Sequence, residues 1–424
     1  MKHIIVTGGS GFIGSALISQ LLRNDIKVTM LGRFQNDKYN QNIRRINWKL
    51  GDAIPDCVSF LDPNWPLADG VIHLAHEWKD QSGARSLNHS ATRVLFDSTI
   101  KAGISRFVFA SSVSSSAEAK NNYGQIKRQI EQDLISDRFI PVKIGLVYGG
   151  SQAGQWNILC KLVRFTPILP MLHPKQMVQP IHISEVVNGL IKLTLASELR
   201  LREYVLAGSK PLMFSNFLKK VAHICFGRRI KVISIPAAPV LYALEFTKHL
   251  PGVKNIKEKV LGLLGLPVLE TKKSLDELSL TLMNLEEGLT KDTLNQKRLI
   301  KEAYIVLFSV LGRRPSFFAI RSYIRGVNLW DNGIQIRMPL LARLHPLFLR
   351  LYDPVFRNLE PRDTNGTIGG RIYLAALVLE ASDMAPEIYS YEKTGIFWGA
   401  LRGVKILTQE ALLLPIRIVI SWIK

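Results

Sequence analysis

The sequence predicts an α/β protein: a doubly wound parallel sheet, a smaller substrate-facing region and an extra C-terminal, mainly helical segment. Two observations predict the sheet. Short apolar runs rich in Val, Ile and Phe alternate with helical patterns along the first half of the chain, and a glycine-rich turn follows the first run. Such alternation is typical of parallel βαβ units, and strands that are apolar throughout are usually covered on both faces.

The expected strands of the sheet share a short, continuous apolar run, and they are His3–Val6, Lys27–Leu31, Gly70–Ala75, Arg106–Ala110 and Ile140–Ile144. The helical patterns between them are Ile13–Leu22, Ala91–Ala102 and Gly124–Leu134. After Tyr148 the rhythm changes, and the expected elements are strands at Ile181–Ile183, Tyr204–Leu206 and Lys231–Ile235 and a helix from Ser184. This smaller region is expected to face the substrate, so the predicted domains are residues 1–289 and 290–424.

The charge of the chain narrows the classes of partner. Its 424 residues include 55 Lys and Arg against 34 Asp and Glu, which gives a net charge of +21, yet 47% of the residues are hydrophobic. A nucleic-acid binder of this charge is usually more polar, so we expect no nucleic-acid partner. A basic and apolar chain fits an anionic ligand or an anionic membrane surface.

Cysteine usage and the absence of a long apolar run indicate the compartment. Cys57, Cys160 and Cys225 are odd in number and far apart, which argues against a disulfide framework and against a zinc site. The first residues lead directly into the glycine-rich turn, as in a folded beginning rather than a signal peptide. No apolar run reaches the roughly 18–20 residues that span a bilayer. We therefore expect a cytoplasmic protein, peripheral to the membrane if its tail binds lipid.

The glycine-rich turn has the pattern of a dinucleotide site. The segment Thr7–Gly14 reads TGGSGFIG, with glycines at every third position between an expected strand and an expected helix. Glycine permits the tight turn, the close approach of backbone to pyrophosphate and the close packing of helix on strand, while the helix N-terminus offers free N–H groups. An ordinary strand–helix turn is the alternative, and the context disfavours it. The predicted cofactor contacts here are Gly8, Ser10, Gly11, Phe12, Ile13 and Gly14.

The end of the second strand indicates which dinucleotide binds. An acidic residue at this point would accept a hydrogen bond from the ribose 2′-hydroxyl of NAD, but the chain reads Leu31-Gly32-Arg33. A guanidinium holds a 2′-phosphate through charge-assisted hydrogen bonds. We therefore favour NADP(H) over NAD(H), with a solvated surface arginine as the alternative for Arg33. Asp52, in the pair Gly51-Asp52 after a further strand that would follow Lys27–Leu31, is expected at the adenine end.

A second group of polar residues has the pattern of a catalytic site. Tyr123 and Lys127 are four residues apart, so a helix places them on one face. A neighbouring ammonium stabilises the phenolate and lowers the pKa of the tyrosine, which then exchanges a proton as hydride moves to or from nicotinamide. Ser112 ends the preceding strand, where its hydroxyl would orient the reacting oxygen. An ordinary helix surface is the alternative for the Tyr–Lys pair alone.

The motifs together resemble the extended short-chain dehydrogenase/reductase family, also called the NAD-dependent epimerase/dehydratase family, over about residues 1–290. They are Thr7–Gly14, Val71–Ala75, Phe107–Ser112, Tyr123–Lys127, Leu146–Gly149 and Gln179–Ile183. The resemblance implies a Rossmann-type domain that binds NAD or NADP, with Ser112, Tyr123 and Lys127 as catalytic residues. It also implies that Leu74 and Ala75 line the adenosine side, that Asn88 organises the site, and that the substrate is a small molecule, most simply a nucleotide sugar.

Two departures from the family pattern leave a second class of function open. Only ten residues separate Ser112 from Tyr123, and His76-Glu77-Trp78 replaces the small residues usual after the strand Gly70–Ala75. The enzyme would be an oxidoreductase or epimerase acting by hydride transfer. The alternative is a non-catalytic scaffold or assembly protein at a membrane, stabilised by NADP(H). The complete Ser–Tyr–Lys set favours the enzyme.

The segment from Thr290 to the C-terminus resembles no family that the sequence identifies. Its apolar runs, Tyr304–Leu311, Ile372–Leu379 and Ala411–Ile423, are too short to span a bilayer. Arginines border them, and Arg343, Arg350 and Arg357 recur every seven residues among apolar side chains. A basic stripe beside an apolar face is typical of a helix at an anionic membrane interface. A helical appendage packed on the enzyme domain, or the contact of a homodimer, is the alternative.

Overall fold

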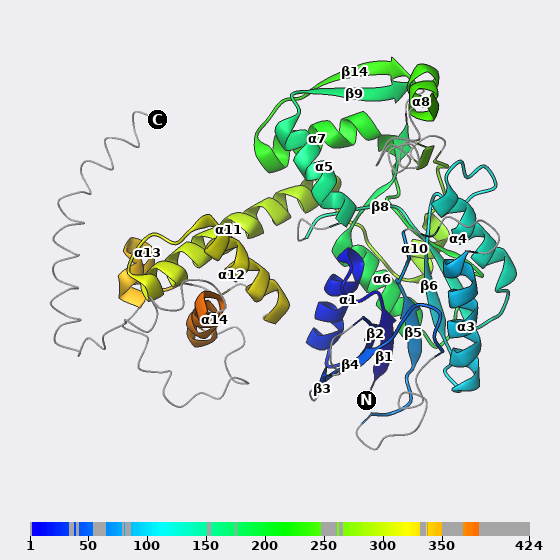
Figure 1. Cartoon of the computed structure of the whole chain (residues 1–424), viewed down its shortest axis with the longest axis horizontal. Helices are drawn as coiled ribbons and strands as arrows, with labels where there is room; N and C mark the ends of the chain where they lie inside the picture. The colour runs from blue at the N-terminus through cyan, green and yellow to red at the C-terminus, as the bar shows by residue number, and fades with distance from the viewer. Residues whose placement is uncertain are drawn as a thin grey trace. The chain divides into compact units, whose positions relative to one another are not determined.

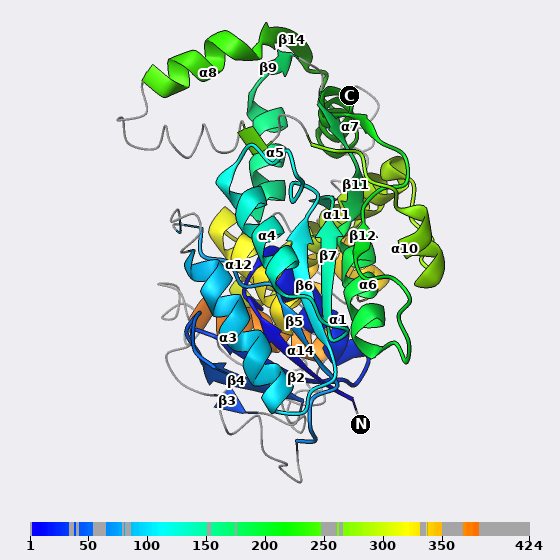
Figure 2. The same ribbon diagram turned by 90° about the vertical axis from the view of Figure 1, so that its right-hand side faces the viewer.

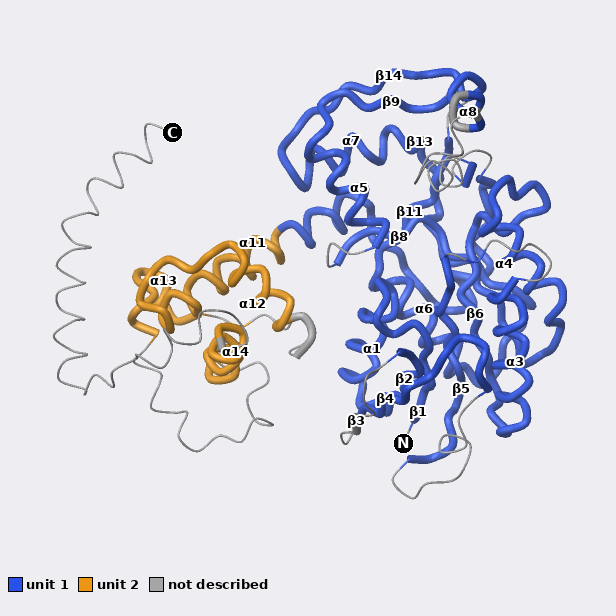
Figure 3. The backbone as a smooth tube through the Cα atoms, viewed as in Figure 1, with its two compact units in different colours: residues 1–293 blue, residues 294–424 orange. Residues whose placement is uncertain are grey.

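The chain forms two compact units, Met1–Thr293 and Leu294–Lys424 (Figure 3). The computed structural model describes residues 2–33, 38–39, 42–53, 65–78, 80, 86–150, 154–173, 176–246, 261–262, 266–330, 336, 338–349 and 368–380. The sequence placed the domain boundary after residue 289, whereas α11 (Leu285–Leu311) continues through that position and takes part in both units.

An eight-stranded sheet forms the centre of the first unit, and its predicted fold class is confirmed. Its strands lie in the order β12 (Tyr204–Leu206), β7 (Phe139–Ile144), β6 (Phe107–Ser112), β5 (Gly70–His73), β1 (His3–Thr7), β2 (Lys27–Gly32), β4 (Ile43–Asn47) and β3 (Lys38–Tyr39). All neighbours are parallel except β3, which pairs antiparallel with β4 at the edge. The chain builds outward from β1 to β4 and then returns to β5 on the other side of β1. Such a switch point opens a crevice at the carboxyl ends of the strands.

Helices cover both faces of this sheet (Figure 1). One face packs against α1 (Phe12–Arg23) and α6 (Ile183–Leu195), and the other against α3 (Leu87–Lys101) and α4 (Asn122–Asp133). Alternate residues of a strand supply the two cores: Ile4 joins the first and Ile5 the second. This explains why the strands are apolar throughout rather than at every second residue.

Several element boundaries differ from the sequence expectation by a few residues, and two of these differences have a clear local cause. The strand expected at Gly70–Ala75 ends at His73, because Leu74 and Ala75 turn across the glycine loop. The helix expected from Ala91 begins at Leu87, because the hydroxyl of Ser86 accepts a hydrogen bond from the His89 amide and caps it.

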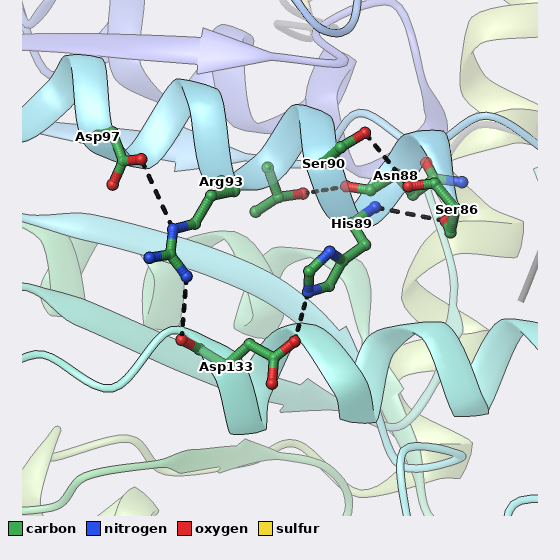
Figure 4. A network of polar contacts seen from close by, with 8 residues as sticks. Ser86, Asn88, His89, Ser90, Arg93, Asp97 and Asp133 are labelled. Atoms are coloured by element: carbon green, nitrogen blue, oxygen red, sulfur yellow. Dashed lines mark hydrogen bonds and ion pairs between the residues drawn. The ribbon is translucent and has the colours of Figure 1, made fainter. Parts of the chain in front are cut away.

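Polar contacts fasten α3 to α4 on the outer face (Figure 4). His89 Nε2 lies 2.7 Å from Asp133 Oδ2, and Arg93 donates to the Asp133 carbonyl oxygen at 3.5 Å. Arg93 also pairs with Asp97 one turn further along α3, at 3.6 Å. These contacts fix α4, the helix that bears the predicted Tyr–Lys pair, against its neighbour.

A smaller lobe of the first unit lies beyond the carboxyl ends of the main strands (Figure 2). Its elements are β8 (Leu146–Tyr148), α5 (Gly154–Phe165), β9 (Ile168–His173), β10 (Met177–Val178), β11 (Pro180–His182), β13 (Leu212–Met213), α7 (Phe214–Phe226), β14 (Lys231–Pro236) and α8 (Ala237–Phe246). The short helix α10 (Lys272–Glu277) packs instead against β12 of the main sheet, where the Val205 amide donates to the Ser274 hydroxyl at 2.9 Å. The core of the lobe contains Trp156 and Phe217, together with Leu289 from the first turns of α11. Cys160 and Cys225 are free thiols within this lobe, whereas Cys57 lies outside the described residues.

The second unit is helical where the structure describes it. It comprises most of α11, then α12 (Phe317–Trp330), α13 (Leu340–Leu344) and α14 (Ile368–Glu380) around a core of its own. Inside that core the fully buried Arg371 pairs with Glu302 at 3.4 Å, and the hydroxyl of Tyr323 donates to Glu302 at 3.1 Å. No helix in the described part of the chain is long and apolar enough to cross a membrane. Arg350, Arg357 and the apolar run Ala411–Ile423 lie outside the described residues.

Candidate active site

The glycine loop is a place where main chains pack too closely for side chains. Gly8 has φ +69°, and a Cβ there would lie 2.7 Å from the amide nitrogen of Ala75. A Cβ on Gly14 would overlap the carbonyl oxygen of Gly8 and lie 2.7 Å from the Cα of Gly9. Gly11 closes the turn by donating its N–H to the Gly8 oxygen at 3.0 Å. The spacing of the three glycines therefore allows β1, the loop and α1 to meet.

The N-terminus of α1 fits the pyrophosphate of a dinucleotide. Gly11 is its N-cap residue and gives no side-chain cap, so the first-turn amides are left for a ligand. Ser10 is exposed beside them, and Phe12 and Ile13 pack their side chains against the core below. The backbone concavity and the helix dipole together suit an anionic group.

A chain of hydrogen bonds joins the ends of β1 and β5 beside this loop. Thr92 donates its hydroxyl to the Asn88 carbonyl at 2.7 Å, so its oxygen accepts from Nε2 of His73 at 3.2 Å. Nδ1 of His73 then accepts from the Thr7 hydroxyl at 2.7 Å, and Thr7 Oγ1 accepts from the Ala75 amide at 3.2 Å. Burial lowers the pKa of His73 to about 3, so the ring is neutral, as this order of donors requires. His73 is thus structural, and it holds Ala75 over Gly8.

Asn88 fixes the loop that follows β5. Its Oδ1 accepts from the Glu77 amide at 2.8 Å, and its Nδ2 donates to the Glu77 carbonyl at 3.0 Å. Asp80 accepts from both the amide and the side chain of Asn88, at 2.9 and 3.0 Å. The organising role that the family resemblance implied for Asn88 corresponds here to a clamp on Glu77 and Asp80.

The structure brings Ser112, Tyr123 and Lys127 together at the carboxyl edge of the sheet. Ser112 is the last residue of β6, and Tyr123 and Lys127 share one face of α4, one turn apart. The Ser112 hydroxyl hydrogen-bonds to the Ser114 hydroxyl at 2.9 Å, and its proximity opposes the rise that burial causes in the pKa of the Tyr123 phenol. Nζ of Lys127 is buried, donates to the Ala110 carbonyl at 2.7 Å, and lies 5.8 Å from the centre of the Tyr123 ring.

A glycine that the sequence reasoning passed over makes this packing possible. A Cβ on Gly124 would overlap the carbonyl oxygen of Ser114, so only glycine allows the first turn of α4 to reach the loop after β6. Asn121 caps the same turn by accepting from the Gly124 amide at 3.2 Å. Gly124 follows Tyr123 directly in the sequence, and this position is the signal that would have identified the glycine.

Burial sets the protonation states of the two ionisable groups. It raises the pKa of Tyr123 to about 12, an effect that the Ser112 hydroxyl opposes. It lowers the pKa of Lys127 to about 7, an effect that the carboxylate of Glu131 opposes. At these values the phenol is protonated at neutral pH, and the ammonium of Lys127 is close to its midpoint.

Two aromatic side chains from the clamped loop lie against Tyr123. The indole of Trp78 stacks on the Tyr123 ring with centroids 5.1 Å apart and planes 16° from parallel, and 64% of Trp78 remains exposed. His76 packs edge-on against both rings, at 4.8 and 4.9 Å. Burial lowers the pKa of His76 to about 3, so this imidazole is neutral. The departure from small residues at 76–78 thus places an aromatic face beside the predicted proton donor.

Behind the site, Glu131 joins three elements. It accepts hydrogen bonds from Ser111 and, at 2.7 Å, from Ser115, and it lies 3.9 Å from Nζ of Lys143. Lys143 also pairs with Glu203 at 3.0 Å. Glu131 lies one turn beyond Lys127 on α4. The sequence reasoning missed it, although its i+4 spacing from a buried lysine was a usable signal.

The residues predicted for the adenosine end lie at the ends of β2 and β4. Arg33 is exposed directly after β2. Asp52 is also exposed, and its carboxylate accepts from the Lys49 amide at 3.0 Å, which closes the turn after β4. Leu74 and Ala75 lie across the glycine loop, as described above. Among the described residues, no group of three or more His, Cys, Asp or Glu side chains is arranged as metal ligands would be.

Comparison with known proteins confirms the resemblance predicted from the sequence. Residues 4–137 match the model of the NAD dependent epimerase/dehydratase family, and the C-terminal segment lies outside this match. An epimerase family protein of Staphylococcus saprophyticus is 30% identical over 108 residues, which are 23% of this chain and 32% of that protein. A putative dihydroflavonol 4-reductase of Synechocystis is 32% identical over 112 residues, 26% of this chain and 32% of that protein. The chain thus spans about a third of the length of these relatives.

Solved structures share the fold over a longer part of the chain. The UDP-glucose 4-epimerase of Thermotoga maritima, solved with UDP-glucose, covers 70% of this chain and 98% of its own, with 17% identity and a TM-score of 0.51. MoeE5, solved with UDP-glucuronic acid and NAD, covers 70% of this chain and 99% of its own, with 20% identity and a TM-score of 0.51. These similarities establish the Rossmann-type fold of the first unit.

Proposed function

We propose that the protein is an NAD(P)-dependent oxidoreductase or epimerase that acts on a sugar nucleotide or a related polar alcohol or ketone. The observation that carries the proposal is the meeting of Ser112, Tyr123 and Lys127 at the carboxyl edge of the sheet, beside the glycine loop. A non-catalytic scaffold that is stabilised by its cofactor needs only the glycine loop and not the Ser–Tyr–Lys set. The family match of residues 4–137 supports the same reaction class.

Each residue has a role that follows from its surroundings. Tyr123 holds the proton that the substrate oxygen gains or loses, and Ser112 donates to or accepts from the same oxygen. Lys127, whose Nζ lies 5.8 Å from the centre of the Tyr123 ring, has the role of stabilising the phenolate when it carries its ammonium charge. A bound nicotinamide ring supplies the hydride acceptor or donor. The pyrophosphate of this cofactor would be held by the backbone at Gly8, Gly11 and Gly14 and by the open N-terminal end of α1.

We propose NADP(H) as the preferred cofactor and NAD(H) as the alternative. Arg33 lies exposed at the end of β2, where a 2′-phosphate would be bound, and no acidic side chain takes the place of a ribose-binding carboxylate between Leu31 and Arg33. Asp52 would contact the adenine end from the turn after β4.

We propose a nucleotide sugar as the substrate. Two solved structures of the same fold contain UDP-sugars, and the chain's net charge of +21 suits a diphosphate. The exposed face of Trp78 beside Tyr123 offers an apolar surface on which the ring of a sugar or an aromatic aglycone packs. The cytoplasmic location and the homodimer expected from the sequence remain predictions.

The direct test is to identify the nucleotide that purifies with the protein and to follow its oxidation or reduction with a panel of UDP- and dTDP-sugars. We expect turnover of at least one of them. Retention of the nucleotide without turnover of any polar alcohol or ketone would favour the alternative, a non-catalytic scaffold stabilised by its cofactor. Product analysis by mass spectrometry separates epimerisation, reduction and dehydration.

A further inference from the structure

The second unit exposes large apolar side chains on two neighbouring helices. Phe317 and Phe318, at the start of α12, are 81% and 71% exposed. On α13, Leu340 and Leu344 are 77% and 59% exposed, with Leu341 also exposed between them. Single exposed apolar side chains are common, whereas a group of five large ones in so small a unit is not.

Helical spacing places basic residues on the same face of α12 as Phe317. Arg321 and Arg325 follow Phe317 at intervals of four, and all three are exposed. The opposite face of the helix carries Ala319, Tyr323 and Val327, which are buried in the core of the unit. The helix therefore packs with one face and presents an aromatic and basic stripe with the other.

The two exposed groups belong to one end of the unit. His345, directly after α13, packs edge-on against Phe308 near the end of α11, with ring centroids 5.8 Å apart. Only Gly312–Ser316 separate the end of α11 from α12. Figure 1 shows α13 beside the end of α11. The start of α12 and the leucines of α13 thus flank the same end of α11.

The charge of this region selects the partner. Residues 303–352 contain seven arginines, no lysine and one acidic residue, Asp331. The exposed segments themselves, Arg313–Arg325 and Leu340–Leu344, contain no acidic residue. An apolar group bordered by arginines alone complements a surface with an apolar interior and anionic headgroups. A second copy of this surface would bring like charges together and would be disfavoured.

We propose that Phe317, Phe318, Leu340, Leu341 and Leu344 form a lipid-docking surface that inserts into the interface of an anionic membrane, with Arg314, Arg321 and Arg325 at its rim. The phenylalanines and leucines bury their side chains at the level of the headgroups, without any helix crossing the bilayer. Each rim arginine near an anionic leaflet adds about fivefold to the binding constant. This inference does not depend on the proposed enzymatic activity.

The test is co-sedimentation of the full chain with vesicles of phosphatidylcholine alone and of phosphatidylcholine with phosphatidylserine. We expect binding to the anionic vesicles and little to the neutral ones. Salt should weaken the binding, because the Debye length falls from about 10 Å at 0.1 M to about 3 Å at 1 M. A full chain that stays in the supernatant with anionic vesicles at low salt would overturn the proposal.

Paired variants locate the surface. The double variant Phe317→Ser/Phe318→Ser should reduce the binding constant at least tenfold, and the triple variant Arg314→Gln/Arg321→Gln/Arg325→Gln should remove most of the preference for anionic lipid. Ile135→Ser is the matched control, since Ile135 is 79% exposed but lies in the first unit. Leu340→Ser/Leu344→Ser provides an independent second disruption, and thermal unfolding checks that each variant folds.

Several outcomes would contradict the docking of lipid by this surface. Binding that survives the phenylalanine and leucine substitutions, or falls equally with Ile135→Ser, would show that this surface does not dock lipid. Sedimentation equilibrium gives the remaining alternative: dimerisation that Phe317→Ser/Phe318→Ser abolishes, without lipid binding by the parent chain, would assign the surface to a second copy of the protein.

Discussion

The two halves of the candidate site are built in different ways. The cofactor half consists of backbone: Gly8 and Gly14 allow main chains to approach, and α1 presents its amides. The catalytic half consists of side chains: Tyr123 and Lys127 acquire their properties from burial, from Ser112 and from Glu131. The shape of the cofactor half therefore depends on the positions that lack a side chain. The protonation states in the catalytic half depend on the residues that surround Tyr123 and Lys127. Substitutions should therefore damage the two halves in different measurable ways.

The largest expected effect is on turnover in the catalytic half. Tyr123→Phe removes the phenolic oxygen, and we expect turnover to fall by at least about 10²-fold, the scale of lost general acid–base catalysis. Cofactor affinity and the melting temperature should change little, because the ring still packs against Trp78. Steady-state kinetics with cofactor titration measure both. Full turnover by this variant would exclude the proposed proton donor.

The next effect is on the cofactor half and should appear without any substrate. Gly14→Ala places a Cβ against Gly8 and Gly9, so α1 must shift, and we expect a destabilisation of about 1–3 kcal/mol with a loss of dinucleotide affinity. Gly11→Ala is the matched control for stability, because Gly11 has φ −74° and its Cβ would lie 3.1 Å from the Gly8 oxygen. Equal melting temperatures for the two variants would contradict the packing argument.

The features that the sequence predicts are those that depend on local patterns, and the features that it does not predict depend on contacts between distant residues. The strands, the glycine loop and the Tyr–Lys helix are local patterns with fixed periods, and the structure contains them within a few residues. The clamp by Asn88 and the approach of Trp78 to Tyr123 join positions 11 and 45 residues apart in the chain, and no local pattern encodes such pairings. The short edge strand β3 also escaped notice, because two residues carry no periodicity.

In the second unit, the sequence predicts even less of the structure. Its sequence offers no motif, and its composition predicted only that basic and apolar residues occur together. Which of them are exposed depends on tertiary packing: Tyr323 and Phe317 are both aromatic and both on α12, yet one is fully buried and the other is 81% exposed.

A smaller effect is expected on the choice of cofactor. Arg33→Asp replaces a partner of the 2′-phosphate by an acceptor for the 2′-hydroxyl, and it adds repulsion of the phosphate. Hydrogen bonds to charged groups contribute about 1.5–3 kcal/mol, so the ratio of the NADPH and NADH dissociation constants should change at least tenfold in favour of NADH. Isothermal titration with both nucleotides measures it. An unchanged ratio would make Arg33 a surface residue and remove the basis for preferring NADP(H).

The smallest effect should be a displaced pH profile. Burial lowers the pKa of Lys127 to about 7, and the Glu131 carboxylate works against that shift. If the ammonium form is the active one, kcat/KM for the cofactor, which reports the free enzyme, should fall as pH rises through this value. Glu131→Gln removes the opposing negative charge and keeps one carbonyl oxygen that accepts from Ser111 or Ser115, while its NH2 group can donate to the hydroxyl of the other serine. The pKa of Lys127 should therefore fall further. The alkaline limb of the profile should then move to lower pH, while the melting temperature changes little.

The matched control is Asp133→Asn, on the same helix but bonded to His89 on the outer face, which should leave the limb in place. A limb that stays fixed in Glu131→Gln, or moves to higher pH, would show that Glu131 does not set the charge of Lys127.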